Sequence, residues 1–506
     1  MSDTPTHTAD VVIVGGGVTG CVIATRLSAA QPNLKILIME MGPDVRDEPA
    51  VRTPGIYMNN LVPGAPYSQF YIGEPSEALL GNSVIVAAGA CVGGGSAINW
   101  MVYTRGSASD YDDWKNEYGN PGWGFDDLLP LFKKSEAYFG EGDLSTHGTD
   151  GPLQATYGGI VSKINLEWFK TAPAYDGRPV VPDGQDFKTG NAFTRWAKWI
   201  GKDGKRSDIA HGYLYPQMDR SSNITLLTKT HVSRVLFEGD KAVGVEYFTS
   251  ASDPPRQVRA TKMVVVTAGT LSTPQILERS GIGARAHLEA LGIPVVSDLP
   301  NVGEGYQDHL IVKSEYVRES DDTGTSRDDL LRGIPEVMER VQKEYTEHGT
   351  GELATNEADV ATCKWLYKLG REQARRMPSY RGEYAAMHPS FPPGGEAACK
   401  AGPRYRVGPV AMDAPDIVYS SEDEKALEEW IRRNVGVVWH GVATCAMRPR
   451  ADGGVVSPRL DVYGTQKLKV ADLSICPSNV SANMYSTAVA VGEKAAQLIL
   501  EDLAAV

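Results

Sequence analysis

Cysteine is scarce in this chain and shows no metal-ligand spacing. Six cysteines are spread over 506 residues with no CxxC pair among them. So few cysteines in so long a chain do not make a disulfide scaffold, and we expect free thiols in a reducing compartment. No metal site is predicted.

Long apolar runs and targeting signals are also missing. No uninterrupted apolar stretch approaches the roughly 20 residues that span a bilayer, so no membrane segment is expected. Residues 1–10 are polar and lack the apolar core of a secretory signal. The C-terminal Ala504-Ala505-Val506 is not an SKL-type peroxisomal address. These absences predict a cytoplasmic protein.

Excess positive charge is absent as well. The formal net charge is -13 and there is no basic tract, which excludes a nucleic-acid partner. Glycine, by contrast, is plentiful. Several of the 53 glycines cluster in segments whose backbone is expected to approach a neighbouring group closely. The length allows two or three packed units around a shared core.

The N-terminal segment has the pattern of a β-α-β unit. A short β-branched run, 10–14, predicts a buried parallel strand, and 18–27 has a helical pattern. A second strand is predicted over 35–39. Farther along, 231–238 and 242–248 predict a hairpin, and 263–267 another buried strand.

A dinucleotide motif lies between the first strand and the first helix. Gly15, Gly17 and Gly20 form GxGxxG, whose small residues let backbone amides and the helix N-terminus reach a pyrophosphate. Glu40 ends the next strand, 20 residues past Gly20, where it can bind a ribose. Glu40 disfavours NADP, whose 2′-phosphate it would repel. NAD and FAD are not distinguished by this motif.

Three further motifs resemble the glucose-methanol-choline (GMC) oxidoreductase family, and most closely its fungal alcohol (methanol) oxidases. The first runs from Val92 to Trp114 and includes GGGSAIN, and the second is GTLSTPQIL followed by SGIG. The third comprises WHG, TCAM, LKVAD and a later asparagine. The resemblance covers most of residues 8–360 and 361–503. In the second motif, Ser272 or Thr273 is expected to cap a short helix.

The resemblance implies FAD as the cofactor. Glycines 15, 17 and 20 would then meet the pyrophosphate, Glu40 the ribose and the backbone of Val232 the adenine. The segment containing Gly93, Gly95, Ser96 and Asn99 would lie along the isoalloxazine ring. Asp472 and Thr487 complete the expected cofactor set, the latter in a helix whose N-terminus faces the flavin. Ile98 stands where some relatives carry a flavin-linked histidine, so non-covalent FAD is expected.

The resemblance also supplies the catalytic candidates. His440 is expected to act as the general base, since imidazole titrates near neutral pH. Asn483 matches a second active-site position and can donate a hydrogen bond but cannot act as a base. Without the resemblance, a histidine in an apolar stretch would more often be a core residue.

These features predict an α/β (α+β overall) fold. A Rossmann-like FAD-binding domain is expected from residues 1–160, 205–310 and 436–506, and a smaller substrate domain with an antiparallel sheet from 161–204 and 311–435. The substrate domain should be truncated, since family motifs that are normally well separated meet near Val360.

The favoured function is FAD-dependent oxidation of a primary alcohol to an aldehyde. Dioxygen or another electron acceptor would be the second partner. A place in fungal secondary metabolism is a further expectation. The alternative is a catalytically weak or inactive accessory protein with the same fold, because of the missing segment. An NAD-linked dehydrogenase would leave the other motifs unexplained. On family grounds alone a peroxisomal location is also open.

Overall fold

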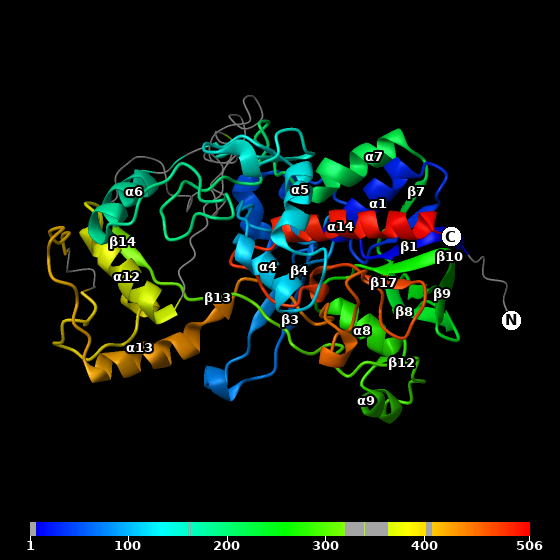
Figure 1. The fold of residues 1–506 in the computed structure, drawn as a ribbon. Coiled ribbons are helices and arrows are strands. Elements are labelled where there is room, and N and C mark those ends of the chain that lie inside the picture. Colours follow the sequence, from blue (N-terminus) through cyan, green and yellow to red (C-terminus); the bar gives the residue numbers. More distant parts are fainter. Residues whose placement is uncertain are drawn as a thin grey trace.

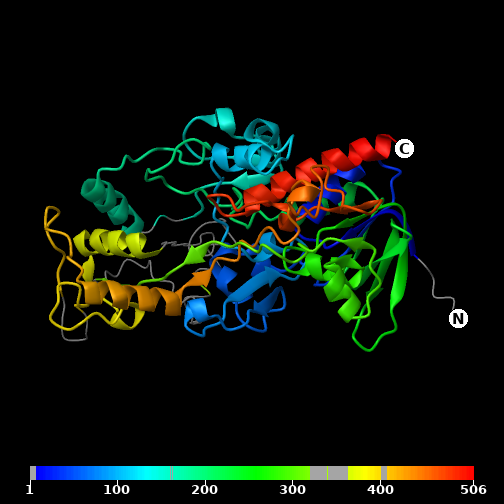
Figure 2. The same cartoon turned by 60° about the horizontal axis from the view of Figure 1, so that its bottom comes forward.

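The computed structural model describes residues 7–159, 161, 163–318, 339, 363–400 and 407–505. A mixed sheet lies at one end of the molecule with the C-terminal helix α14 (Tyr485–Ala504) packed beside it (Figure 1). Helices α6 (Lys163–Asp176), α12 (Cys363–Arg376) and α13 (Ser421–Asn434) gather at the other end. In Figure 2 the red α14 and the yellow α12 mark these two ends.

The mixed sheet takes strands from the start, the middle and the end of the chain. Its order is β7-β2-β1-β10-β9-β8, and β17 pairs with β10. Strands β7, β2, β1, β10 and β17 are parallel to their neighbours, whereas β9 is antiparallel to β10 and β8 to β9. Their bounds are β1 His7–Val14, β2 Ile36–Met39, β7 Ile224–Leu227, β8 His231–Glu238, β9 Lys241–Phe248, β10 Arg256–Val266 and β17 Leu468–Val470.

The first strand and helix form the centre of the core. Residues 11–14 are Val-Val-Ile-Val and are buried, as expected for a parallel strand covered on both faces. The following helix α1 (Val18–Ala30) packs against α14. A Cβ on Gly492 would come within 2.9 Å of the Cβ of Val22, so glycine is what allows the two helices to approach so closely.

Most predicted elements are confirmed, with shifted ends. The first strand begins at His7 and not at Asp10, and α1 continues to Ala30. Strand β10 begins at Arg256, well before the predicted residue 263, because its first half pairs with β9. Pairing with a distant strand extended an element that local hydrophobicity had marked only in part.

The predicted helix cap at Ser272 or Thr273 is wrong. Helix α8 (Ser272–Arg279) has Leu271 at its N-cap, without a side-chain cap. The Ser272 hydroxyl instead bonds the Tyr71 hydroxyl at 2.8 Å, and the Thr273 hydroxyl donates to Asp472 Oδ2 at 2.6 Å. These tertiary partners use the hydroxyls that a local cap would have required.

Two short antiparallel pairs are formed by strands that follow residue 309. Strand β13 (Leu310–Ile311) pairs with β16 (Gly436–Val437), and β14 (Tyr316–Arg318) with β15 (Tyr380–Glu383). The expected antiparallel sheet of the substrate domain consists, over the residues that the structure describes, of two-stranded pairs. The junction near Val360 lies outside the described residues.

The other helices and strands are mostly short. They are α2 Pro49–Arg52, β3 Ser68–Ile72, β4 Ile85–Gly89, α3 Gly95–Ile98, α4 Ala108–Asn116, α5 Phe125–Ser135, β5 Glu136–Tyr138, β6 Leu153–Ala155, α7 Tyr215–Arg220, α8 as above, β11 Ile282–Gly283, α9 Arg285–Ala290 and β12 Ser297–Asp298. In the described ranges no helix is both long and apolar enough to cross a membrane. Cys21, Cys91, Cys399, Cys445 and Cys476 are free thiols.

Candidate active site

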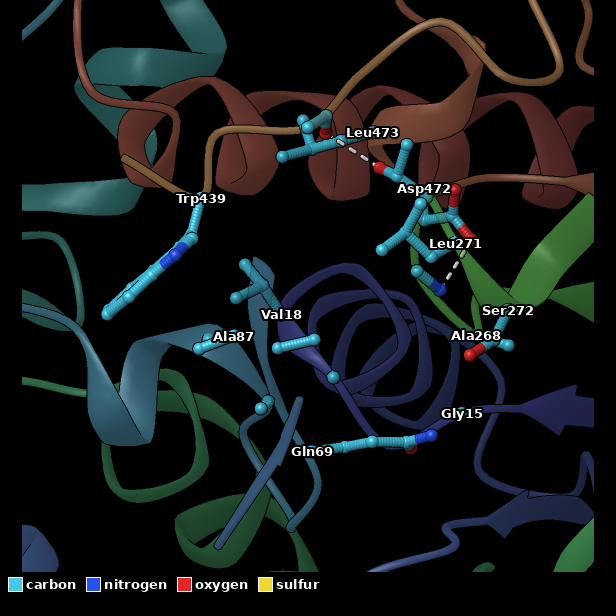
Figure 3. Close-up of a pocket in the computed structure, with 18 of the residues that line it drawn as sticks. Gly15, Val18, Gln69, Ala87, Ala268, Leu271, Ser272, Trp439, Asp472 and Leu473 are labelled. Carbon is cyan, nitrogen blue, oxygen red and sulfur yellow. Dashed lines mark hydrogen bonds between the residues drawn. The ribbon is translucent and has the colours of Figure 1, made fainter. Parts of the chain in front are cut away.

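A cavity of about 790 Å³ adjoins the ends of strands β1, β2 and β10. Its wall is assembled from segments that are far apart in the sequence. Figure 3 shows Gly15 and Val18 from the first turn, Ala87 and Gln69 from the β3–β4 pair, and Trp439 and Asp472 from the C-terminal part around one space. A cavity of this size lies within the range of cofactor and ligand sites.

The GxGxxG turn lines the cavity with its first two glycines. Gly15 and Gly17 are on the wall, and Gly15 has φ +107°. A Cβ on Gly15 would come within 2.4 Å of the Thr267 carbonyl oxygen. Gly20 is not on the wall: its Cβ would meet the Gly15 carbonyl oxygen at 2.2 Å. The third glycine therefore serves close packing of the helix on the turn and does not contact the cavity.

Glu40 is buried at the cavity wall and is held by two backbone amides. Gly16 N donates to Oε2 at 2.7 Å and Gly42 N donates to Oε1 at 2.9 Å. Burial raises the pKa of Glu40 to about 7, against the opposing effect of these amides. Each oxygen keeps a second acceptor direction, which suits a ribose diol. Val232, in β8, also lines this part of the cavity.

The glycine-rich segment after β4 lies beside the GxGxxG turn, where Gly93 N donates to the Gly16 carbonyl at 2.8 Å, and provides the adjoining part of the wall. Gly95, Ser96 and Asn99 line the cavity, whereas Gly93 does not. Gly93 instead has φ +92° and turns the chain, and a Cβ there would contact the Ala210 Cβ at 3.4 Å. Asn99 is fixed by Arg206, whose Nη1 donates to Asn99 Oδ1 at 2.8 Å.

Asp472 fixes the segment that opens α8. Its Oδ2 accepts from the Gly269 amide at 2.9 Å, in addition to the Thr273 hydroxyl, and it lines the cavity. Burial raises the pKa of Asp472, while its hydrogen bonds lower it. Thr487 is not on the wall: its hydroxyl bonds Tyr111 at 3.0 Å. The residues at the start of α14 that line the cavity are instead Met484, Tyr485 and Ala488.

His440 and Asn483, the two catalytic candidates, meet at the cavity. Asn483 Nδ2 lies 3.2 Å from His440 Nε2, and both residues line the wall. Burial, with a smaller contribution from the neighbouring His309, lowers the pKa of His440 to about 3. His440 is therefore neutral at physiological pH, with a ring nitrogen able to accept a proton.

Several neighbours of His440 were not predicted. His309 Nδ1 lies 3.0 Å from His440 Nδ1, and the Asp308 carboxylate accepts the His440 backbone amide at 2.9 Å. Thr104 donates its hydroxyl to Asn483 Oδ1 at 2.8 Å. Thr104 lies within the first family motif, so the sequence offered a reason to consider it. No local pattern indicates a role for His309.

Trp439 turns the chain immediately before His440. Its φ is +64°, which is rare for a bulky residue, and its indole N–H donates to the Ile85 carbonyl at 3.0 Å. Strained backbone of this kind persists where surrounding contacts fix it, often at functional sites. The bond to β4 supplies such a contact and helps to direct His440 towards the cavity.

The cavity residues fit a flavin dinucleotide. Gly95 and Gly269 line the cavity, and a Cβ on either would meet no atom within 4 Å, so both leave space for a bound group. The α1 N-terminus favours a pyrophosphate, and Glu40 a ribose. The cavity lining as a whole is more apolar than polar, which suits a stacked ring system.

Comparisons with known proteins agree with this arrangement. The family models for the N- and C-terminal parts of GMC oxidoreductases match residues 9–311 and 350–492. The chain is 33% identical to the alcohol oxidases of Pichia angusta and Candida boidinii, over 98% of its own length and 95% of theirs. The first of these alignments extends over 637 positions.

A solved structure is also similar. An FAD-dependent oxidoreductase from Chaetomium thermophilum shares 26% identity, with a TM-score of 0.76 over 98% of this chain and 99% of that one. The glycine turn, Glu40 and the His440 site thus occur in a chain that matches both family models over most of its length. The protein belongs to the GMC oxidoreductase family and its cofactor is FAD.

Proposed function

We propose that this protein, an FAD-dependent alcohol oxidase or dehydrogenase, converts a primary alcohol to an aldehyde with His440 as the general base. The observation that carries the proposal is the neutral His440 imidazole, which faces Asn483 on the wall of the cavity that fits the cofactor. The substrate is a small or aromatic alcohol, and the second partner is dioxygen or another electron acceptor.

Two groups have to leave the substrate during this reaction. The hydroxyl loses a proton and the adjacent carbon loses a hydride. Bound FAD supplies the acceptor of the hydride. The protein must therefore hold the hydroxyl near a base, orient the carbon and keep competing water away.

His440 and Asn483 can share the hydroxyl between them. When an alcohol enters, its oxygen can accept from Asn483 Nδ2 while its proton points at His440 Nε2, where the two side chains now face each other at 3.2 Å. His440 takes the proton, and the amide stabilises the charge left on oxygen. The lowered pKa of His440 keeps the nitrogen free before the alcohol binds.

Ile98 supports a non-covalent cofactor. It lies on the cavity wall and has no nucleophilic atom to bond the flavin. Acid precipitation of the holoprotein should release the flavin into the supernatant, and flavin that stays with the pellet would contradict this.

The substrate domain is proposed to be shortened. The alignment with the Pichia angusta alcohol oxidase has 637 positions, more than this chain has residues, so gaps in this chain account for part of it. Residues 161–204 and 311–435 are the proposed substrate domain, in which the described strands β14 and β15 form one short pair. A shortened domain also motivates the alternative of a weak or inactive accessory protein.

The decisive experiment follows flavin reduction without oxygen. An alcohol panel first identifies a substrate by flavin bleaching and by peroxide formation in air. His440→Ala should then keep FAD and reduce it about a hundred- to ten-thousand-fold more slowly. Asn483→Ala should cost less, because it removes a hydrogen bond and not the proton acceptor.

A matched control is available in α9. His287→Ala removes an exposed histidine, whose side chain is 55% accessible, and should leave reduction unchanged. If His440→Ala reduces its flavin at the parent rate, the base is wrongly assigned. If no alcohol bleaches the flavin of the parent, the accessory-protein alternative is favoured.

A further inference from the structure

The hydrogen-bond chain behind His440 starts at a main-chain carbonyl. His309 Nε2 lies 2.8 Å from the Val480 carbonyl oxygen. A carbonyl has no proton to donate, so this nitrogen of His309 must carry the hydrogen. A neutral His309 then has its lone pair on Nδ1.

That lone pair determines the state of His440. The two Nδ1 atoms are 3.0 Å apart, and two lone pairs cannot face each other at that distance. His440 Nδ1 therefore carries the hydrogen and donates to His309. The lone pair of His440 is left on Nε2, the nitrogen that faces Asn483.

The hydrogen bonds on the Asn483 side of His440 independently lead to the same tautomer. The Thr104 hydroxyl oxygen accepts the Asn483 backbone amide at 3.0 Å and donates its hydrogen to Asn483 Oδ1 at 2.8 Å. The amide of Asn483 therefore presents Nδ2, a donor, to His440. A donor requires a lone pair on His440 Nε2, which agrees with the assignment from Val480.

A charged His309 would break this agreement. Both of its nitrogens would then donate, His440 Nδ1 would have to accept, and its Nε2–H would point at the Asn483 donor. With His309 neutral, a donor faces an acceptor in all four contacts: His309 with Val480, His440 with His309, Asn483 with His440, and Thr104 with Asn483. The neighbouring backbone holds it in place, since Val438 N donates to the His309 carbonyl at 3.1 Å and Asp308 Oδ1 accepts the amides of His309 and His440.

We propose that His309 is a positioning residue that fixes His440 in the tautomer with its lone pair on Nε2, the nitrogen directed at the substrate. This proposal rests on the proposed role of His440 as base. In the other tautomer the cavity would be offered an N–H, which cannot take a proton from an alcohol.

Two substitutions of His309 separate this role from simple packing. His309→Leu keeps an apolar side chain of moderate size but offers His440 no acceptor. His309→Gln offers an amide oxygen to His440 Nδ1–H and an amide N–H to the Val480 carbonyl. We expect His309→Leu to slow anaerobic flavin reduction about 10- to 100-fold, by analogy with the loss of the partner that orients a metal-ligating histidine. His309→Gln should restore the rate to near that of the parent, and alcohol affinity should change little in both.

The tautomer itself can be measured. In holoenzyme labelled with 15N-histidine, long-range nitrogen–proton correlations distinguish Nδ1–H from Nε2–H, and the signals missing from His440→Ala assign His440 among the nine histidines. We expect Nδ1–H in the parent and in His309→Gln. Nε2–H in the parent would overturn the proposal, even if His309→Leu did not fold.

The outcomes keep this proposal apart from the proposed function. Parent-like reduction in His440→Ala would reject the base and with it this proposal. Slow reduction in His440→Ala together with parent-like reduction in folded His309→Leu would reject His309 alone. Equal losses of flavin-reduction rate in His309→Leu and His309→Gln would also reject the positioning role of His309, because the packing of the ring and not its hydrogen bonds would then determine the rate.

Discussion

Thr104 and Asn483 exchange two hydrogen bonds across 379 residues of sequence: the Asn483 amide donates to the Thr104 hydroxyl oxygen, and that hydroxyl donates to Asn483 Oδ1. A single hydroxyl thus sets both the backbone position and the side-chain orientation of the residue that faces His440. This reciprocity leads to the first prediction.

Thr104→Val should slow flavin reduction without releasing FAD. The methyl group fills the place of the hydroxyl but leaves the Asn483 amide free to rotate. The substitution removes both hydrogen bonds. The one that orients the Asn483 side chain bears on the reaction, and loss of such a neutral bond costs about 1 kcal/mol, which corresponds to about a fivefold slower rate. Thr104→Ser keeps the hydroxyl and is the control. Equal rates in Thr104→Val and the parent would show that Asn483 is oriented by other contacts.

The rate of flavin reduction should lack an acid limb near the usual histidine pKa. The reaction needs neutral His440, so the rate falls only when pH drops through the pKa of that group. Burial lowers this pKa to about 3, compared with about 6.5 for a free histidine. We therefore expect a flat profile from about pH 8 down to about pH 5, measured by anaerobic stopped-flow. A fall centred near pH 6.5 would contradict the lowered pKa.

Glu40→Gln should weaken FAD binding. In glutamine one of the two terminal atoms is a donor, and it would face the amide of Gly16 or Gly42, each of which donates to Glu40 now. Glutamine also offers the ribose hydroxyls one acceptor atom in place of two, and loss of a hydrogen bond to a carboxylate costs about 1.5–3 kcal/mol, so the Kd for FAD should rise about tenfold or more. Titration of the apoprotein with FAD, followed by flavin fluorescence, measures it. Glu238→Gln removes an equal charge from an exposed carboxylate and should leave the Kd as in the parent.

Gly95→Ala should affect the cofactor more than the fold. A Cβ at this position meets no atom within 4 Å, so the apoprotein should melt at the same temperature as the parent. The methyl group projects into space that the cofactor needs, and FAD should bind about tenfold more weakly or worse.

Gly20→Ala provides the contrast to Gly95→Ala. Its Cβ would come within 2.2 Å of the Gly15 carbonyl oxygen, so it should lower the melting temperature of the apoprotein itself. Thermal unfolding of both apoproteins, each with an FAD titration, separates the two effects. A marked loss of apoprotein stability in Gly95→Ala would mean that this residue is part of the packing and not of the cofactor space.

Local patterns predicted the elements that depend on local forces. The buried run at 11–14, the following helix, strand β2 and the β8–β9 hairpin were all recognised, because hydrophobic periodicity and turn residues determine them within a few positions. The start of β10 was missed because a distant partner strand extends it. The cap of α8 was missed because Tyr71 and Asp472 use the hydroxyls of Ser272 and Thr273.

The cofactor residues divide in the same way. Spacing alone placed Gly15, Gly17 and Glu40 at the cavity, since strand, turn and helix follow one another without interruption. Spacing could not tell that Gly20 and Thr487 face other protein atoms. The rotation of α14 about its axis decides which of its first residues reach the cavity, and that rotation is set by packing against α1 and α5.

The sequence by itself determined the family, the dinucleotide turn and the two residues, His440 and Asn483, whose side chains carry the proposed chemistry. Only the tertiary structure brought His309 to His440, across 131 residues, through the pairing of β13 with β16. The physical reason is that a side chain's identity fixes which protons it can hold, whereas its tautomer depends on the partner at its other nitrogen. For His440 that partner is His309, which immediately precedes β13 in a distant part of the sequence, and no local pattern specifies it.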